Sequence, residues 1–214
     1  MVLVLCAVVR PETPSEGLER LDRGAVSVLY ETRERAPRAE RDELLRFGDV
    51  VQLVTRMGAA LPFRFGTVVE DQASLEALAA DREVGWGRRL DVVSGHVELV
   101  VHAGEPVPHL PSSGSGRDYL MARAAVHRHA EEVFTAVLRA VEGVSRETRL
   151  LRGRDETRLA CLVPVGAEQR LRTAVQQWAD ERQGRDVLVT GPWPPFSFTE
   201  VPADSPTDDR EVPV

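Results

Sequence analysis

The apolar residues of this chain fall into two patterns, short runs that are almost wholly apolar and longer stretches with an apolar residue every three or four positions. The runs at 2–9 and 25–30 are rich in Val and Leu, which predicts two buried strands joined by a loop of Pro, Gly and Glu. Pro37 opens a helical stretch that we expect to end at Gly58. Its buried face consists of Leu44, Phe47, Val51 and Val54.

The middle of the chain predicts a strand, a helix and another strand. Residues 61–69 alternate, with Arg64 opposite the apolar side, as a half-buried strand would. Asp71 is a good cap for the next helix, in which Gly85 and Gly87 predict a kink or break. We expect this helix to bury Leu75, Ala79, Trp86, Leu90 and Val93. Val97, Leu99 and Val101 then alternate with His96, Glu98 and His102 in a further strand.

A segment rich in Pro, Ser and Gly at 104–117 predicts a linker or long loop. The most regular helical pattern of the chain follows it and ends at Gly143. The apolar stripe of that helix consists of Tyr119, Ala122, Val126, Ala130, Val133, Val137 and Val141.

The last third of the chain predicts a hairpin, a helix and a strand. The runs 144–151 and 158–165 flank a polar turn, as the two strands of a hairpin would. A helix around Leu171 and Trp178 and a strand at 186–190 follow. The prolines after Gly191 predict an extended segment up to residue 201 that is not helical.

The order of these elements predicts an α+β fold of two domains. From His96 onward the order is strand, helix, strand, strand, helix, strand, which is the ferredoxin-like βαββαβ pattern. We therefore expect a smaller mixed α/β unit at 1–94 and a ferredoxin-like domain at 95–201, with the linker or loop at 104–117. The acidic, Pro-bearing segment 202–214 is expected to be a disordered tail.

The composition and charge of the chain argue against some classes of binding partner. Of the 214 residues 43% are hydrophobic and 29% charged, which suits a soluble globular protein. The net charge of −7 and the pI near 5.4 argue against nucleic acid or a lipid membrane as partner. All 27 basic residues are arginine, which we interpret as a coding bias of the source genome. The apolar run at 2–9 lacks the features of a signal peptide, and no stretch reaches the roughly 20 apolar residues of a membrane span, so we expect a cytoplasmic protein.

The residues that commonly bind metals lack suitable spacing. Cys6 and Cys161 each sit within an apolar strand-like run, where a cysteine behaves as a small buried hydrophobe. His127 and His129 are two positions apart on a helix, so they project about 200° apart and cannot serve one metal. We expect no metal and no cofactor.

Catalytic and nucleotide-binding patterns are also missing. Residues 114–118 could present backbone N–H groups to an anion, but they lack the Lys and Ser/Thr of a phosphate-binding loop. A G-x-S-x-G elbow does not occur. The central strands of the expected ferredoxin-like domain carry no aromatic residue on which RNA bases could stack. We expect that the protein is not an enzyme.

Four segments together resemble the gas vesicle GvpF/GvpL family. They are LPFRFGTV at 61–68, GHVE at 95–98, GRDYL at 116–120 and GPWPPFSF at 191–198. In the last segment Phe196 stands where many members have Tyr. The residues that we single out from them as a structural or partner-binding motif are Arg64, Phe65, Gly66, Glu98, Tyr119, Pro192, Trp193, Pro195 and Phe196.

The resemblance implies an accessory or minor structural protein of gas vesicles in a prokaryotic cytoplasm. The implied partner is the small, hydrophobic shell subunit of the GvpA type, with other accessory proteins as further partners. The family offers no catalytic residues, and these segments do not separate the F type from the L type. One alternative is a ferredoxin-like domain that binds a small regulatory molecule, which requires a pocket with convergent polar groups. The other is an enzyme, which requires perturbed ionisable groups in a cleft.

Two hypotheses concern particular side chains. Trp193 and Phe196 either pack on the second domain or form an exposed anchor, and we favour packing because large aromatic residues are usually buried. Arg64 and Glu98 both leave their strands on the less apolar side. If the two strands are neighbours, we expect an ion pair or a shared network that fixes their register.

Overall fold

The structure is a computed structural model that describes residues 1–103, 115, 117, 121, 133–152, 157–182 and 186–200. Apart from residues 115 and 117, the predicted linker lies outside these ranges, as does the predicted tail at 202–214. None of the helices in the described ranges is long and apolar enough to cross a membrane.

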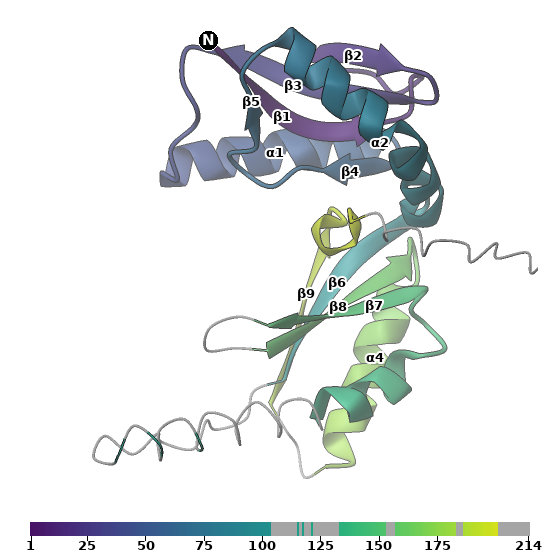
Figure 1. The fold of residues 1–214 in the computed structure, drawn as a ribbon. Coiled ribbons are helices and arrows are strands. Elements are labelled where there is room, and N and C mark those ends of the chain that lie inside the picture. Colours follow the sequence, from purple (N-terminus) through teal and green to yellow (C-terminus); the bar gives the residue numbers. More distant parts are fainter. Residues whose placement is uncertain are drawn as a thin grey trace, which may run out of the picture.

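The N-terminal part of the chain forms the first of two antiparallel sheets (Figure 1). The strand order is β2-β3-β1-β4, and a short fifth strand, β5, also pairs with β1. The strands are β1 (Val2–Val9), β2 (Glu19–Arg23), β3 (Val26–Arg33), β4 (Ala60–Pro62) and β5 (Val68–Val69). The predicted strands at 2–9 and 25–30 are therefore confirmed.

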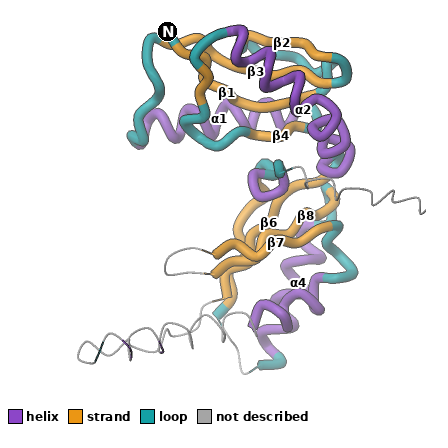
Figure 2. Tube along the Cα trace, in the orientation of Figure 1, coloured by secondary structure: helices purple, strands orange, loops and turns teal. Residues whose placement is uncertain are grey.

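Helices α1 (Arg41–Met57) and α2 (Gln72–Val93) lie on opposite faces of this sheet (Figure 2). Successive side chains of a strand point to opposite faces. Accordingly, Val9 of β1 packs with Val54 of α1, whereas Val8 belongs to the cluster that contains Leu75 of α2.

Two predictions about the helices are confirmed, and of the predicted kink or break in α2 the break does not occur. The side chain of Asp71 accepts a hydrogen bond from the Ser74 N–H at 2.8 Å, so it caps α2 as expected. The five residues predicted to be buried on α2 are buried. However, α2 runs without a break through Gly85 and Gly87, because a helix interior tolerates glycine at a cost of only about 1 kcal/mol each.

Two predictions about the strands are wrong. Residues 61–69 do not form one strand, because β4 ends at Pro62 and a turn separates it from β5. The expected loop between the first two predicted strands contains β2, which pairs with β3 in a hairpin. The sequence of β2, ERLDR, does not show the apolar pattern of a strand, since only one of its five residues is apolar.

The C-terminal part forms the second sheet, in the order β7-β8-β6-β9, with every pairing antiparallel. Its strands are β6 (His96–Ala103), β7 (Glu147–Arg152), β8 (Thr157–Pro164) and β9 (Val187–Trp193). Helix α4 (Glu168–Asp180) and the helical residues 133–141 cover one face, through a cluster that includes Leu99, Val137 and Leu171. The predicted hairpin corresponds to β7 and β8, and the predicted α+β composition is confirmed.

The other face of the second sheet turns towards the first sheet. A 3-10 turn, η1 (Phe196–Phe198), lies between the two sheets (Figure 1). The prediction that this segment is extended and not helical is wrong at these three residues, because Pro194 and Pro195 precede the turn and so remove none of its hydrogen bonds. One core cluster combines Leu162 of β8 and Phe198 with residues of the first sheet and α2. The two sheets therefore share a core.

Candidate functional site

Three of the four segments singled out in the sequence meet where the two sheets join. Strand β4, which leads into the turn at 63–67, contacts η1. The first half of β6 pairs with the end of β9, and the chain beyond β9 returns to the first sheet. Tyr119, from the fourth segment, lies outside the described residues. We call this region the junction and define it by residues 63–67, 98 and 193–200.

The turn at 63–67 is anchored by aromatic contacts on both faces of the first sheet. The ring of Phe63 makes an edge-to-face contact with Trp86 of α2, with centroids 5.9 Å apart. The ring of Phe65 makes the same kind of contact with Phe47 of α1, at 5.5 Å. Both contacts hold the turn firmly against the fold.

Gly66 closes this turn and leaves Arg64 at its tip. Gly66 has a φ of 81°, in the left-handed region that favours glycine. The N–H and the hydroxyl of Thr67 both donate to the carbonyl of Arg64, at 3.1 and 2.7 Å. The side chain of Arg64 is 90% exposed, and its guanidinium lies 3.7 Å from the Glu200 carboxylate.

Glu98 of β6 is buried and binds Ser197 of η1. Its carboxylate accepts hydrogen bonds from the Ser197 N–H at 2.8 Å and from the Ser197 hydroxyl at 2.7 Å. Burial raises the pKa of the Glu98 carboxyl, and the bonds from Ser197 and the charge of Arg149 offset only part of that rise.

The predicted ion pair between Arg64 and Glu98 is therefore wrong. Arg64 belongs to a turn of the first sheet, whereas Glu98 lies on a strand of the second sheet. Each has a different partner, Glu200 for the arginine and Ser197 for the carboxylate. Glu98 instead holds η1 against β6 through its bonds to Ser197.

Arg89 of α2 reaches across the junction to the second sheet. It is buried, donates to the carbonyl of Phe198 through Nε, and pairs with Glu147 of β7 at 2.7 Å. Partial burial raises the pKa of the Glu147 carboxyl, but the hydrogen bonds and charges of Arg89 and Arg149 outweigh this effect, so that pKa is lowered. This contact joins an element of each sheet.

Phe198 lies fully buried between two arginine side chains. The guanidinium carbons of Arg89 and Arg149 lie 5.9 and 5.7 Å from its ring centre. Arg149 also pairs with Glu200 at 3.1 Å. The sequence patterns did not single out Arg89 or Phe198. A signal for Arg89 existed, because it lies on the same helical stripe as Trp86 and Val93.

Trp193 and Phe196 are exposed, by 47% and 39% respectively, so the prediction that they pack on the second sheet is wrong. Phe198 takes the buried place instead. Pro194 and Pro195, between the two exposed aromatic residues, are buried, whereas Pro192 is exposed. The indole N–H of Trp193 donates to the Thr190 hydroxyl at 3.3 Å.

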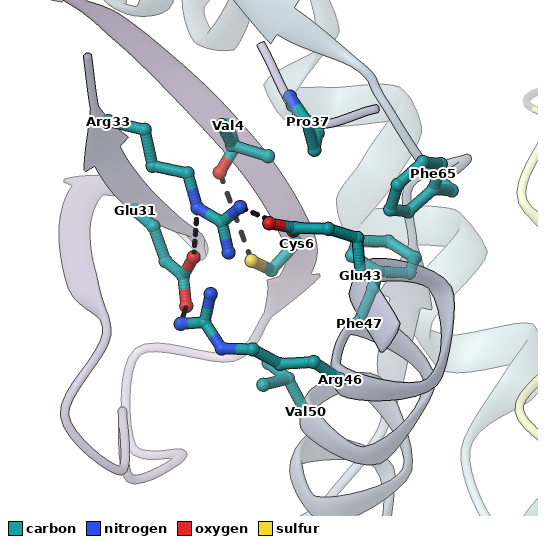
Figure 3. A pocket seen from close by; sticks show the side chains of 10 residues that line it. All are labelled: Val4, Cys6, Glu31, Arg33, Pro37, Glu43, Arg46, Phe47, Val50 and Phe65. Atoms are coloured by element: carbon teal, nitrogen blue, oxygen red, sulfur yellow. Dashed lines mark hydrogen bonds and ion pairs between the residues drawn. The ribbon is translucent and has the colours of Figure 1, made fainter. Parts of the chain in front are cut away.

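A small pocket lies between α1 and the first sheet, with Phe65 of the junction in its lining (Figure 3). A chain of ion pairs borders it: Arg46 lies 2.7 Å from Glu31, Glu31 lies 2.9 Å from Arg33, and Arg33 lies 2.6 Å from Glu43. The cavity volume is about 10 Å³, which is space for about one water molecule. This pocket is too small for a regulatory ligand.

A larger and more open hollow of about 290 Å³ lies beside the loop between β3 and α1. Charged side chains dominate its lining, and ligand pockets are mostly apolar, so this hollow gives little support to a small-molecule site. It is lined by Arg33, Glu34, Arg35, Ala36, Pro37, Arg38, Glu40 and Glu43.

Cysteine and histidine chemistry within the described ranges is limited. Both cysteines are buried, and burial is the main cause that raises the pKa of each thiol to about 12. The His96 ring bonds to the Ser94 carbonyl and the His102 ring to the Thr190 hydroxyl. The described residues contain no group of three or more His, Cys, Asp or Glu side chains that could hold a metal. His127 and His129 lie outside them.

Comparison with known proteins gives one family, and solved structures that share the fold include two crystal structures of gas vesicle proteins. The model of the family described as "Gas vesicle synthesis protein GvpL/GvpF" matches residues 12–200. The crystal structure of the gas vesicle protein GvpF from Anabaena sp. PCC7120 has a TM-score of 0.70 and 14% sequence identity, over 94% of this chain and 98% of that chain. The crystal structure of gas vesicle protein GvpF from Microcystis aeruginosa has a TM-score of 0.68 and 17% identity, over 93% of this chain and 99% of that chain. No curated protein sequence matches the chain significantly.

Proposed function

Because this chain belongs to the gas vesicle synthesis protein GvpL/GvpF family, we propose that it is an accessory protein of gas vesicle assembly that binds the hydrophobic shell subunit. The observation that carries the proposal is the family match over residues 12–200, a range that includes every strand and helix described above except β1. The proposed partner is a subunit of the GvpA type, and other gas vesicle accessory proteins are further proposed partners.

A physical argument supports this role. A subunit built to line a gas space exposes apolar surface before it assembles, and such surface leads to aggregation. A soluble protein that covers this surface would keep the subunit available for nucleation. The net charge of −7 of the present chain would help to keep the complex in solution.

We propose that the exposed aromatic residues of the junction form the docking surface. Trp193 is of a residue type that often dominates binding energy, Phe196 is of a type enriched in interface cores, and both are exposed. The buried prolines between them and the bonds between Ser197 and Glu98 provide that support. Arg64, at the tip of the neighbouring turn, supplies a positive charge at the rim.

The proposal also includes the expected location, the expected lack of catalysis and the expected division into domains. The protein acts in the cytoplasm on gas vesicles, catalyses no reaction, and binds neither nucleic acid nor lipid. Its units are a domain at 1–94 and a ferredoxin-like domain at 95–201, the latter supported by the strand order of the second sheet. Since the two sheets share a core cluster, we propose that these domains do not move independently.

Co-expression with a shell subunit tests the proposal. We expect the subunit to co-purify with this chain and its soluble fraction to rise. Replacing both Trp193 and Phe196 by alanine should abolish co-purification, whereas Leu45→Ala should not, since Leu45 is 57% exposed on α1 and is not one of the junction residues. Failure to recover any gas vesicle protein would contradict the function. Recovery that the double replacement leaves unchanged would contradict only the docking surface.

A further inference from the structure

The exposed edges of the two sheets are protected in different ways. An edge strand offers unpaired N–H and C=O groups to other chains, and charged side chains on the strand discourage such pairing. The edge strand β2 has the sequence ERLDR and the edge strand β7 the sequence ETRLLR, so both carry several charges. The edge strand β4, ALP, carries no charge but has only three residues and ends in Pro62. The longer edge strand β9, VLVTGPW, also carries none.

Arg172 of α4 supplies the missing charge from outside the strand. Its guanidinium donates from Nη1 to the carbonyl of Val189 and from Nη2 to the carbonyl of Gly191, the latter at 2.7 Å. One guanidinium reaches both carbonyls, so they point to the same side of β9 even though its register with β6 is irregular next to Gly191. Because β6 occupies the other side of β9, these two carbonyls face the open edge.

The part of β9 before Gly191 is a strong candidate for unwanted pairing. Residues 187–190, VLVT, combine high strand propensity with no charge, and Leu188 is exposed. Pro192 and the irregular register opposite Glu98 and Val100 interrupt pairing only at the far end of the strand. Arg172 is therefore the side chain that occupies the acceptors next to the uncharged run.

We propose that Arg172 keeps the β9 edge closed against a second copy of this chain. The second copy is the occupant that fits best, because two β9 strands can pair antiparallel about a two-fold axis without bringing like charges together. The charged edges β2 and β7 do not offer this match. The guanidinium fork acts in place of the donors of an added strand. When it is removed, the β9 edges of two copies can pair and join their four-stranded sheets into one sheet.

The test is self-association of the full chain, measured by sedimentation velocity over a range of concentrations. Arg172→Leu should associate with an apparent dissociation constant at least about tenfold below that of the unmodified chain. Arg172→Lys keeps the charge but loses one of the two contacts. Its apparent dissociation constant should therefore lie between those of Arg172→Leu and the unmodified chain. Arg170→Leu is the matched control on the exposed side of α4 and should behave as the unmodified chain.

A second replacement identifies the surface. The N–H of Val189 points to the same side as its carbonyl, so Val189→Pro removes an edge donor and should return Arg172→Leu to its original association state. Hydrogen exchange at the Val189 amide should slow with concentration in Arg172→Leu. Circular dichroism and thermal melting establish whether each variant is folded. If Arg172→Leu does not fold, the comparison of Arg172→Lys with the unmodified chain provides the test.

Two results would overturn the proposal. One is a folded Arg172 variant that associates no more strongly than the unmodified chain. The other is association that persists when Val189→Pro is added, because pairing would then use another surface.

Discussion

The carboxylate of Glu98 accepts both hydrogen bonds that Ser197 can donate, one from the main-chain N–H and one from the hydroxyl. The two residues are 99 positions apart in the sequence, and their contact ties the centre of the second sheet to the turn beneath the first sheet. A buried carboxylate in this position makes the stability of the junction depend on protonation.

Replacing Glu98 separates the hydrogen bonds from the charge. Glu98→Ala leaves the Ser197 N–H without its acceptor, so the free energy of unfolding should fall by about 1–3 kcal/mol. Glu98→Gln can keep both contacts, because the serine hydroxyl can accept from the amide, and it should be at least as stable as the unmodified chain at neutral pH. Urea unfolding measures both, and a glutamine variant as unstable as the alanine variant would contradict this account.

The pH dependence of that comparison has a definite sign. Burial raises the pKa of Glu98, so the folded chain binds a proton more readily than the unfolded chain. The contribution of Glu98 to stability therefore increases as the pH falls from neutral towards the ordinary value of 4.5. We expect the advantage of Glu98→Gln over the unmodified chain to shrink over this range. An advantage that grows instead would show that the carboxylate is stabilised by its surroundings.

Arg89 provides a test of the contact between α2 and the second sheet. Arg89→Ala leaves the Phe198 carbonyl and the Glu147 carboxylate without this donor, and should lower the free energy of unfolding by about 2–4 kcal/mol. Arg82→Ala, at an exposed position of the same helix with a surface ion pair to Asp81, should change it by less than about 1 kcal/mol. Thermal unfolding of the two variants measures the difference, and equal effects would contradict the role of Arg89.

Two glycines should respond to alanine in opposite directions. A Cβ at Gly48, in the interior of α1, would meet no atom within 4 Å, so Gly48→Ala should raise the free energy of unfolding by about 0.5–1 kcal/mol. A Cβ at Gly191 would lie 2.7 Å from the Glu98 carbonyl oxygen, and the φ of Gly191 is 109°. Gly191→Ala should therefore lower the free energy by at least about 1–3 kcal/mol. Denaturant titration measures both changes, and two effects of the same sign would contradict the geometry.

The two cysteines should be inert in the folded chain. With the pKa of each thiol raised to about 12, only about one part in ten thousand is thiolate at pH 8. Ellman's reagent should detect both thiols rapidly in guanidinium chloride and neither in buffer on the same timescale. Rapid labelling of either thiol in buffer would show that its strand opens easily.

Local patterns predicted those parts of the fold that depend on neighbouring residues. The buried stripe of α2 was readable because its five members lie within one helix and follow a single period. The break expected at Gly85 and Gly87 was wrong, because the contacts of Trp86 and Leu90 with the core outweigh the weak helix propensity of glycine. Tertiary packing decided the outcome there.

The junction could not be predicted in the same way. The alternation of Phe63 and Phe65 was interpreted as a strand, whereas the two rings pack against different helices from a turn. The partner of Glu98 depended on which strands become neighbours, and alternation along one strand does not contain that information. Similarly, three aromatic residues near the end of the chain competed for one buried position, and only the packing assigned it to Phe198.

The position of Phe198 affects how the chain folds while it is being synthesised on the ribosome. The cluster that buries α2 against the first sheet also needs Leu162 and Phe198, which are synthesised long after the first strands. During translation the N-terminal sheet therefore exposes an incomplete core until residue 198 has emerged from the exit tunnel. Turn η1 completes the core of the first sheet, so this folding step must follow synthesis of residue 198.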